Sequence, residues 1–155
     1  MTGLHPVIQP GPAGGGLRIR LSSLDSGGEL GVVEMEMLAG SAGPPLHIHP
    51  THGEGFYVLD GQLTLQIGQE IITAGGGTWA FAPRNAPHAL ANHSAAAARV
   101  LCVFAPGGFE RRFERMLAEQ EGRQDILAEF ADLAPAERAT QVTGPPIPPP
   151  NPTHL

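Results

Sequence analysis

The residues best suited to chemistry gather in one short segment, H-I-H-P-T-H-G-E, at positions 47–54. Three imidazoles and a carboxylate this close together are either part of a metal site or unrelated polar groups of a loop. Residues two apart in a strand share a face, so His47 and His49 are expected to project together. An antiparallel return of the chain would place the Glu54 carboxylate beside them. An H-x-H pair alone is weak evidence for a metal, so the case depends on further ligands.

A later histidine can complete such a ligand set. His88 opens the strand-like run H-A-L-A-N at 88–92. Its imidazole with those of His47 and His49, and the Glu54 carboxylate, would suit a divalent Fe, Mn, Ni, Cu, Co or Zn ion and leave one or two positions open. No thiolate is among these ligands, which argues against a closed structural zinc site. His52 is expected to be exposed at the rim rather than a fifth ligand.

Three nearby residues have more ordinary interpretations. His93 has the opposite strand parity to His88 and is expected to face outward. Asn92 shares the parity of His88 and could support the site from behind its ligands. Cys102 is the only cysteine, which excludes an intramolecular disulfide framework. Because it lies in the run RVLCVFA, we expect a small buried hydrophobic residue.

Composition excludes several classes of function. The 155 residues carry a net charge of −6, and all nine positive residues are arginine. A nucleic-acid partner is not expected, because phosphate binding needs clustered positive charge. Schiff-base chemistry and a P-loop lysine are excluded by the absence of lysine. The N-terminus lacks the pattern of a signal peptide, and no apolar stretch approaches the roughly 20 residues of a membrane span. We therefore expect a cytoplasmic protein without a membrane partner.

The elements that must position these residues are mostly strands. We expect an irregular segment over 1–16, a strand-rich domain over 17–105, helices over 106–140 and a Pro-rich tail over 141–155. Short apolar or alternating runs between turn residues indicate an all-β sandwich or barrel. These runs lie at 17–21, 30–38, 45–49, 55–60, 62–68, 70–74, 78–82, 88–92 and 98–105.

Turn residues and strand parity refine this picture. Asp60-Gly61 is typical of a type I′ hairpin turn, and a second tight turn is expected over 67–70. If Glu54 points inward, alternation places Phe56 and Val58 inward with it. Trp79 and Phe81 share a face, which lines the barrel or packs under the helices.

The segment after residue 105 has helical rather than strand periodicity. Apolar residues recur at helical spacing over 109–117 and again over 125–133. Pro135 could begin a third short helix. The helices are expected to pack on the barrel or cover a sheet edge, with partner binding as the alternative. The Pro-rich end is expected to be a disordered tail or an arm laid on a neighbouring subunit.

The spacing of the candidate ligands resembles the first motif of the cupin superfamily. That motif is a Gly, five residues, H-x-H, three or four residues, Glu, six residues and Gly. His47, His49, Glu54 and Gly61 match it, while Ser41 stands in the place of the first Gly. This departure falls on a turn position and leaves the ligands unchanged.

A second segment resembles the second cupin motif, which is a Gly, five residues, P-x-G, two residues, His, three residues and Asn. Gly77, Pro83, His88 and Asn92 match, and Asn85 replaces the middle Gly. That exchange is mild, because Asn tolerates positive φ better than most residues. The resemblance covers about residues 30–105 and implies a cupin double-stranded β-helix (jelly-roll) barrel with a short C-terminal helical extension. It also implies one metal ion held by His47, His49, Glu54 and His88.

Function is less determined, because cupins carry out many reactions. The stretch P-G-G-F-E-x-x-F at 106–113 resembles a segment of quercetin dioxygenase-like cupins. We expect a dioxygenase that acts on a hydroxylated aromatic, flavonol-like or otherwise apolar small molecule, with Glu54 as general base and O₂ as co-substrate. The alternatives are a metal-dependent isomerase, decarboxylase or lyase, and a non-catalytic binding protein. Arg84 is the only basic residue near the motifs, which disfavours a phosphate.

Cupins are often dimers, so the resemblance also implies a homodimer. The strand at 17–21 is the candidate for exchange between subunits.

Overall fold

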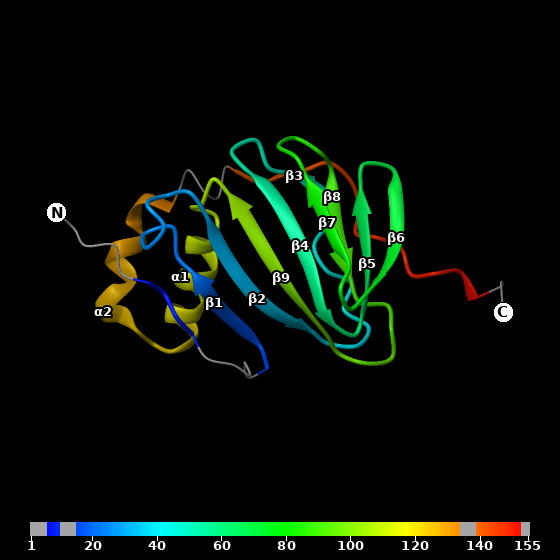
Figure 1. The fold of residues 1–155 in the computed structure, drawn as a ribbon, viewed down its shortest axis with the longest axis horizontal. Helices are drawn as coiled ribbons and strands as arrows, with labels where there is room; N and C mark the ends of the chain where they lie inside the picture. The colour runs from blue at the N-terminus through cyan, green and yellow to red at the C-terminus, as the bar shows by residue number, and fades with distance from the viewer. Residues whose placement is uncertain (1–5, 10–14, 134–138, 153–155) are drawn as a thin grey trace.

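The structure is a computed structural model that describes residues 6–9, 15–133 and 139–152. Within them, two five-stranded sheets face each other as a cupin-type β-barrel (Figure 1). Sheet I has the order β1-β2-β9-β4-β7, and sheet II has the order β10-β3-β8-β5-β6. The strands are β1 (Leu17–Leu21), β2 (Gly31–Met37), β3 (His47–Ile48), β4 (Gly53–Asp60), β5 (Gln62–Ile67), β6 (Glu70–Gly75), β7 (Trp79–Ala82), β8 (His88–Ala91), β9 (Ala98–Ala105) and β10 (Gln141–Val142). The first nine confirm the runs expected from the sequence.

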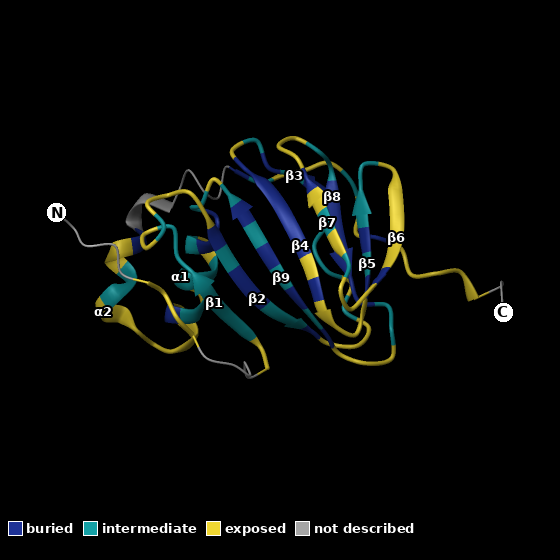
Figure 2. Ribbon diagram, viewed as in Figure 1, coloured by how far each residue is buried: buried dark blue, intermediate teal, exposed yellow. Residues whose placement is uncertain are grey.

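The core between the sheets follows from strand alternation. Every second residue of β9 is buried, including Val100 and Phe104 (Figure 2). Phe56 and Val58 of β4 are buried as predicted. β2 also buries Glu34, which points away from the cavity and pairs with two arginines, Arg20 at 3.1 Å and Arg99. These ion pairs offset the cost of removing the carboxylate from water.

The Asp60-Gly61 turn does not form a hairpin, and that prediction is wrong. β4 pairs with β7 and β9 in sheet I, whereas β5 pairs with β6 and β8 in sheet II. The chain therefore crosses between the sheets at Gly61, whose φ is +79°. A Cβ at this position would lie 2.8 Å from Ala98, so glycine suits both the backbone angle and the close approach. The turn over 67–70 does join a hairpin, β5 to β6.

The helices lie beside β1 and β2, at one end of sheet I (Figure 1). α1 spans Glu110–Gln120, α2 spans Gln124–Leu127, and a 3-10 helix continues over Ala128–Leu133. The third helix expected at Pro135 lies outside the described residues. Among the described residues, no helix has the length and apolar character that a membrane crossing requires.

A buried carboxylate attaches α1 to the barrel. Glu110 is fully buried, and its two carboxylate oxygens accept hydrogen bonds from the backbone N–H groups of Ser23 at 2.6 Å and Gly108 at 2.7 Å. Gly31 of β2 leaves room for it, because a Cβ there would overlap the carboxylate. Glu110 therefore joins the start of α1 to the loop after β1.

The Pro-rich segment packs on its own chain. The sequence had predicted either a disordered tail or an arm laid on a neighbouring subunit. β10 pairs with β3 through Gln141↔Ile48 and Val142↔His47. Further along, Ile147 is buried against Ala89 and Ala91 of β8. The segment therefore covers the outer side of two strands of sheet II.

Trp79 and Phe81 are neither inside the barrel nor under the helices. Both are exposed, and their rings lie over Gly55 and Gly53 of β4, where a side chain would collide with them. Tyr57 is exposed on the same strand. Because the two glycines leave room for the rings, Tyr57, Trp79 and Phe81 form an aromatic outer face on sheet I and do not line the barrel.

Candidate metal centre

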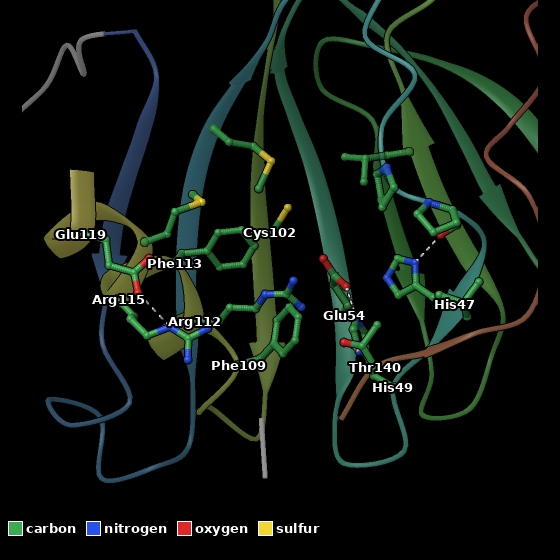
Figure 3. Close-up of a pocket in the computed structure, with 16 residues that line it drawn as sticks. His47, His49, Glu54, Cys102, Phe109, Arg112, Phe113, Arg115, Glu119 and Thr140 are labelled. Atoms are coloured by element: carbon green, nitrogen blue, oxygen red, sulfur yellow. Dashed lines mark hydrogen bonds and ion pairs between the residues drawn. The ribbon is translucent and has the colours of Figure 1, made fainter. Parts of the chain in front are cut away.

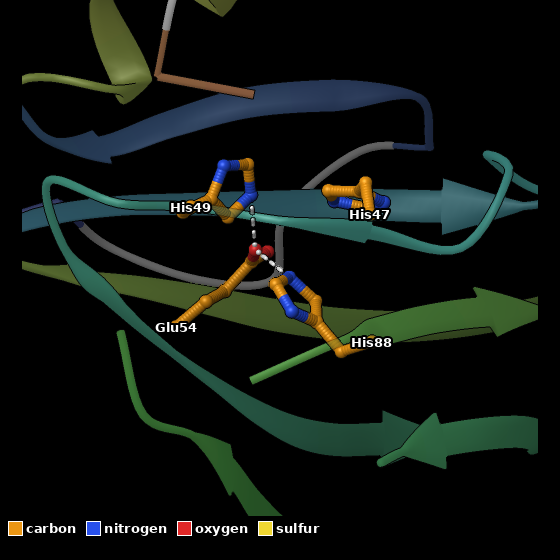
Figure 4. Close-up of side chains that lie close together, drawn as sticks. All are labelled: His47, His49, Glu54 and His88. Atoms are coloured by element: carbon orange, nitrogen blue, oxygen red, sulfur yellow. Dashed lines mark hydrogen bonds and ion pairs between the residues drawn. The ribbon is translucent and has the colours of Figure 1, made fainter. Parts of the chain in front are cut away.

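The four predicted ligands come together inside the barrel, as Figure 4 shows. The ligand atoms of His47, His49, Glu54 and His88 all lie within 4.8 Å of one another, and all four residues are buried. His47 and His88 are directly opposite on neighbouring strands of sheet II. Glu54 does not return beside them in a hairpin, as the sequence suggested. Its strand β4 belongs to sheet I, so the carboxylate reaches the histidines from the opposite wall.

Backbone carbonyls orient the three imidazoles. Each ligand histidine donates a hydrogen bond from Nδ1 to a carbonyl oxygen: His47 to Pro45 at 2.7 Å, His49 to Ala139 at 2.8 Å and His88 to Ala86 at 2.9 Å. A carbonyl oxygen only accepts, so each Nδ1 carries the proton. In the neutral rings, Nε2 then presents a lone pair toward the centre of the cluster, which is the tautomer a metal needs.

The spacing of the donor atoms also fits a cation. Nε2 of His49 and Nε2 of His88 lie 3.1 Å and 3.0 Å from Oε2 of Glu54. Lone pairs on two acceptors at this distance repel each other unless a proton or a metal cation lies between them. Two ligands at right angles around an ion with bonds of about 2.1 Å are about 3.0 Å apart. The cluster therefore suits one divalent transition metal, of a kind that nitrogen and oxygen ligands do not specify.

The pKa shifts of Glu54 and His47 favour metal binding near neutral pH, whereas that of His88 opposes it. Burial alone would raise the pKa of Glu54, but the imidazoles of His49 and His88 beside the carboxylate outweigh it and lower that pKa to about 2. Burial lowers the pKa of His47. For His88, burial is outweighed by the Glu54 carboxylate, and the pKa is raised. His88 is therefore a ligand at which protons compete with a metal as the pH falls.

His52 is buried rather than exposed at the rim, which corrects the expectation. Its ring stacks on that of His49 with centroids 4.3 Å apart and also contacts Phe109 at 4.9 Å. Nδ1 is 2.9 Å from the Thr51 hydroxyl oxygen, and Nε2 is buried without a hydrogen-bond partner among the described residues. Burial is the largest cause that lowers the pKa of His52, to about 4, so the ring is neutral at pH 7. It supports His49 without belonging to the four-residue cluster.

The other polar residues near the motifs stay outside the cluster. Asn92 is buried as expected, but its amide donates to the carbonyls of Met37 and Ala96 and closes the loop after β8. It does not touch a ligand. His93 is half-buried. Cys102 is buried as predicted, and burial raises the pKa of its thiol well above the usual value.

A cavity of about 560 Å³ adjoins the cluster (Figure 3). Its walls are mainly apolar and include Met35 and Leu90. α1 contributes Phe113 and Met116, Phe109 precedes that helix, and the C-terminal segment contributes further residues. The complete lining is Met35, Pro44, Pro45, His47, His49, Glu54, Leu90, Cys102, Phe109, Arg112, Phe113, Arg115, Met116, Glu119, Thr140 and Val142. This is the usual form of a small-molecule site.

Sequence reasoning missed two basic residues of this cavity. Arg112 and Arg115 of α1 line it, whereas Arg84, the expected basic residue, does not. Helical spacing contains the signal: Arg112 is three residues after Phe109 and four before Met116, so it shares their face. That face was assigned to packing, and its position over the cavity requires the tertiary structure.

Two facing sheets with three histidines and one glutamate inside define a cupin barrel. In agreement, residues 33–104 match the family model described as "Cupin domain". No curated protein matches the chain in sequence.

Solved structures support the same fold. TT1209 from Thermus thermophilus is 26% identical with a TM-score of 0.53, over 68% of this chain and 96% of that one. KdgF from Halomonas sp. is 22% identical with a TM-score of 0.52, over 59% and 78%. A predicted oxalate decarboxylase from Thermotoga maritima is 20% identical with a TM-score of 0.55, over 58% and 78%. The last two similarities are evidence of fold alone.

Proposed function

We propose that this protein is a metal-dependent dioxygenase that acts on a hydroxylated aromatic or similarly apolar small molecule. One observation carries the proposal: the three-histidine, one-glutamate cluster opens into a mainly apolar cavity large enough for such a substrate. The resemblance of residues 106–113 to quercetin dioxygenase-like cupins adds support.

The chain's own residues have separate tasks in this reaction. A bound divalent metal would supply a Lewis acid that makes the substrate hydroxyl more acidic. Phe109, Phe113 and Met116 pack against the apolar body of the substrate and exclude water. Glu54 is ionised and lies at the cluster, so it is the nearest base for the hydroxyl proton.

Oxygen consumption tests this function. We expect protein loaded with Fe, Mn, Ni, Cu or Co to take up one O₂ per substrate with at least one member of a panel of flavonols and catechols. Both oxygen atoms enter the product while a carbon–carbon bond breaks, so no external reductant is needed. The Glu54→Gln variant should be about 100-fold slower or worse, because it lacks both the base and a metal ligand. No uptake with any redox-active metal would overturn the proposal.

A metal-dependent decarboxylase or lyase is the second candidate. The arginines at the cavity favour an anionic substrate, and these reactions act on carboxylates. Release of CO₂ or an alkene without O₂ consumption would identify this class. An isomerase would give a product with the same composition as the substrate. A non-catalytic protein would bind its ligand and release it unchanged.

We also propose that the protein forms a homodimer through the aromatic outer face of sheet I. Tyr57, Trp79 and Phe81 are 39%, 54% and 47% exposed, and β7 is the edge strand beside them. Exposed apolar patches on a monomer commonly mark an interface. The strand expected to exchange, β1, pairs with β2 of its own chain instead.

Light scattering tests the dimer. We expect twice the mass of one chain for the wild type and a single-chain mass for a Trp79→Ser, Phe81→Ser double variant. A Leu24→Ser variant, changed at an exposed apolar residue of another surface, should remain dimeric. A wild type with the mass of one chain would contradict the proposal.

A further inference from the structure

Arg112 lies among apolar side chains in the part of the cavity wall that α1 forms. Its neighbours in this wall are Phe109, Phe113 and Met116. In the view of Figure 3, its side chain extends from α1 past Phe109 toward the Glu54 side of the cavity. Arg112 is exposed, so its guanidinium is open to solvent as well as to the cavity.

The other arginines of α1 show what is unusual about Arg112. Arg111 forms an ion pair with Glu114 and lies over the ring of Phe130, with 4.6 Å from Cζ to the ring centre. Arg115 pairs with Glu119 at 3.7 Å. In the described part of the chain, no carboxylate forms an ion pair with Arg112. Its five N–H donors therefore remain available to an acceptor that enters from solution.

The charges around the cavity favour one kind of acceptor. Arg112 and Arg115 are three residues apart and share a helix face, and only Glu119 among the lining residues offsets their charge at this end. The opposite end holds Glu54, which a divalent ion at the histidines would more than neutralise. A planar guanidinium binds a carboxylate through two parallel hydrogen bonds. With one unpaired guanidinium, the site suits a single carboxylate better than a doubly charged phosphate.

We propose that Arg112 is a specificity-determining residue that binds a carboxylate of the substrate. The ligand is then an apolar molecule with a carboxylate at one end, beside α1, and a hydroxyl at the other, beside the three histidines. The orientation rests on the proposed function, because the hydroxyl is assigned to the metal cluster. The carboxylate subsite itself depends only on the cavity and Arg112.

Binding of a matched pair of probes tests the subsite without turnover. Caffeate and its methyl ester have the same ring and hydroxyls and differ in the charge of one end. Calorimetry on zinc-loaded protein is expected to show tenfold or greater preference of the wild type for caffeate. In Arg112→Gln, the caffeate affinity should fall about tenfold or more, while that for the ester stays within twofold.

A neighbouring residue supplies the control. Arg111→Gln removes the same charge from the preceding position, and it should leave both affinities within twofold of wild type. Equal affinity of the wild type for the two probes, undetectable binding of both, or an equal loss of both in Arg112→Gln would overturn the proposal. Because zinc is redox-inert, failure of the dioxygenase proposal would appear in the oxygen assay and not here.

Discussion

Replacing His88 with alanine is expected to leave the purified protein with less than about a tenth of the metal that the wild type carries. His88 supplies one of four ligand atoms, and its Nε2 lies 3.0 Å from the Glu54 carboxylate oxygen in the cluster. Loss of one strong ligand from a mononuclear site weakens binding by orders of magnitude, since even loss of a supporting hydrogen bond costs roughly 10- to 100-fold. His47→Ala should behave alike, and elemental analysis of both proteins measures the effect.

A second measurement separates lost binding from lost folding. Metal added to the metal-free wild type at about 100 times its Kd should raise the free energy of unfolding by about 2.7 kcal/mol, and His88→Ala should show no rise. His93→Ala is the matched control, because His93 is close in sequence but outside the cluster. Wild-type metal content in both ligand variants would show that the four-residue assignment is wrong.

Replacing Glu110 with alanine is expected to lower the free energy of unfolding by about 3 kcal/mol, because each buried unsatisfied group costs about 1–3 kcal/mol. The change removes the acceptor of two backbone N–H groups, those of Ser23 and Gly108, and leaves them inside the protein without a partner. Urea denaturation of the metal-free protein measures the loss without interference from ligand binding.

The same variant should also change the cavity, because Glu110 begins the helix that carries its apolar wall. Caffeate binding to zinc-loaded Glu110→Ala is expected to weaken even where the protein is folded. Glu121→Ala is the control, since Glu121 is exposed at the other end of α1. A Glu110→Ala protein with wild-type stability would mean that the two hydrogen bonds do not hold the helix.

Local pattern predicted most of the strands and the ligand identities. The alternation of β9 and the spacing of His47, His49, Glu54 and His88 are properties of short segments, and both survive in the structure. The two cupin motifs predicted the barrel because their spacing indicates which side chains of each strand face inward.

Long-range pairing accounts for what was missed. The Asp60-Gly61 turn has the chemistry of a hairpin, but pairing of β4 with β9 assigns it to a crossing between sheets. His52 looked like a loop residue because Phe109, which covers it, comes from a distant part of the chain. Arg112 likewise gained its place only when α1 docked at the cavity. None of these contacts can be predicted from nearby residues alone; for Arg112, helical spacing shows which face it shares but not what that face covers.

One hydrogen bond gives the metal centre an order of assembly. The carbonyl that orients His49 belongs to Ala139, and Thr140 beside it lines the cavity. Synthesis proceeds from the N-terminus, so the strands that carry the four ligands emerge before this segment does. His49 is therefore held in its binding orientation only after residues 139–142 have joined sheet II. Of the three carbonyl groups that orient the ligand histidines, the one that holds His49 is the last to be synthesised.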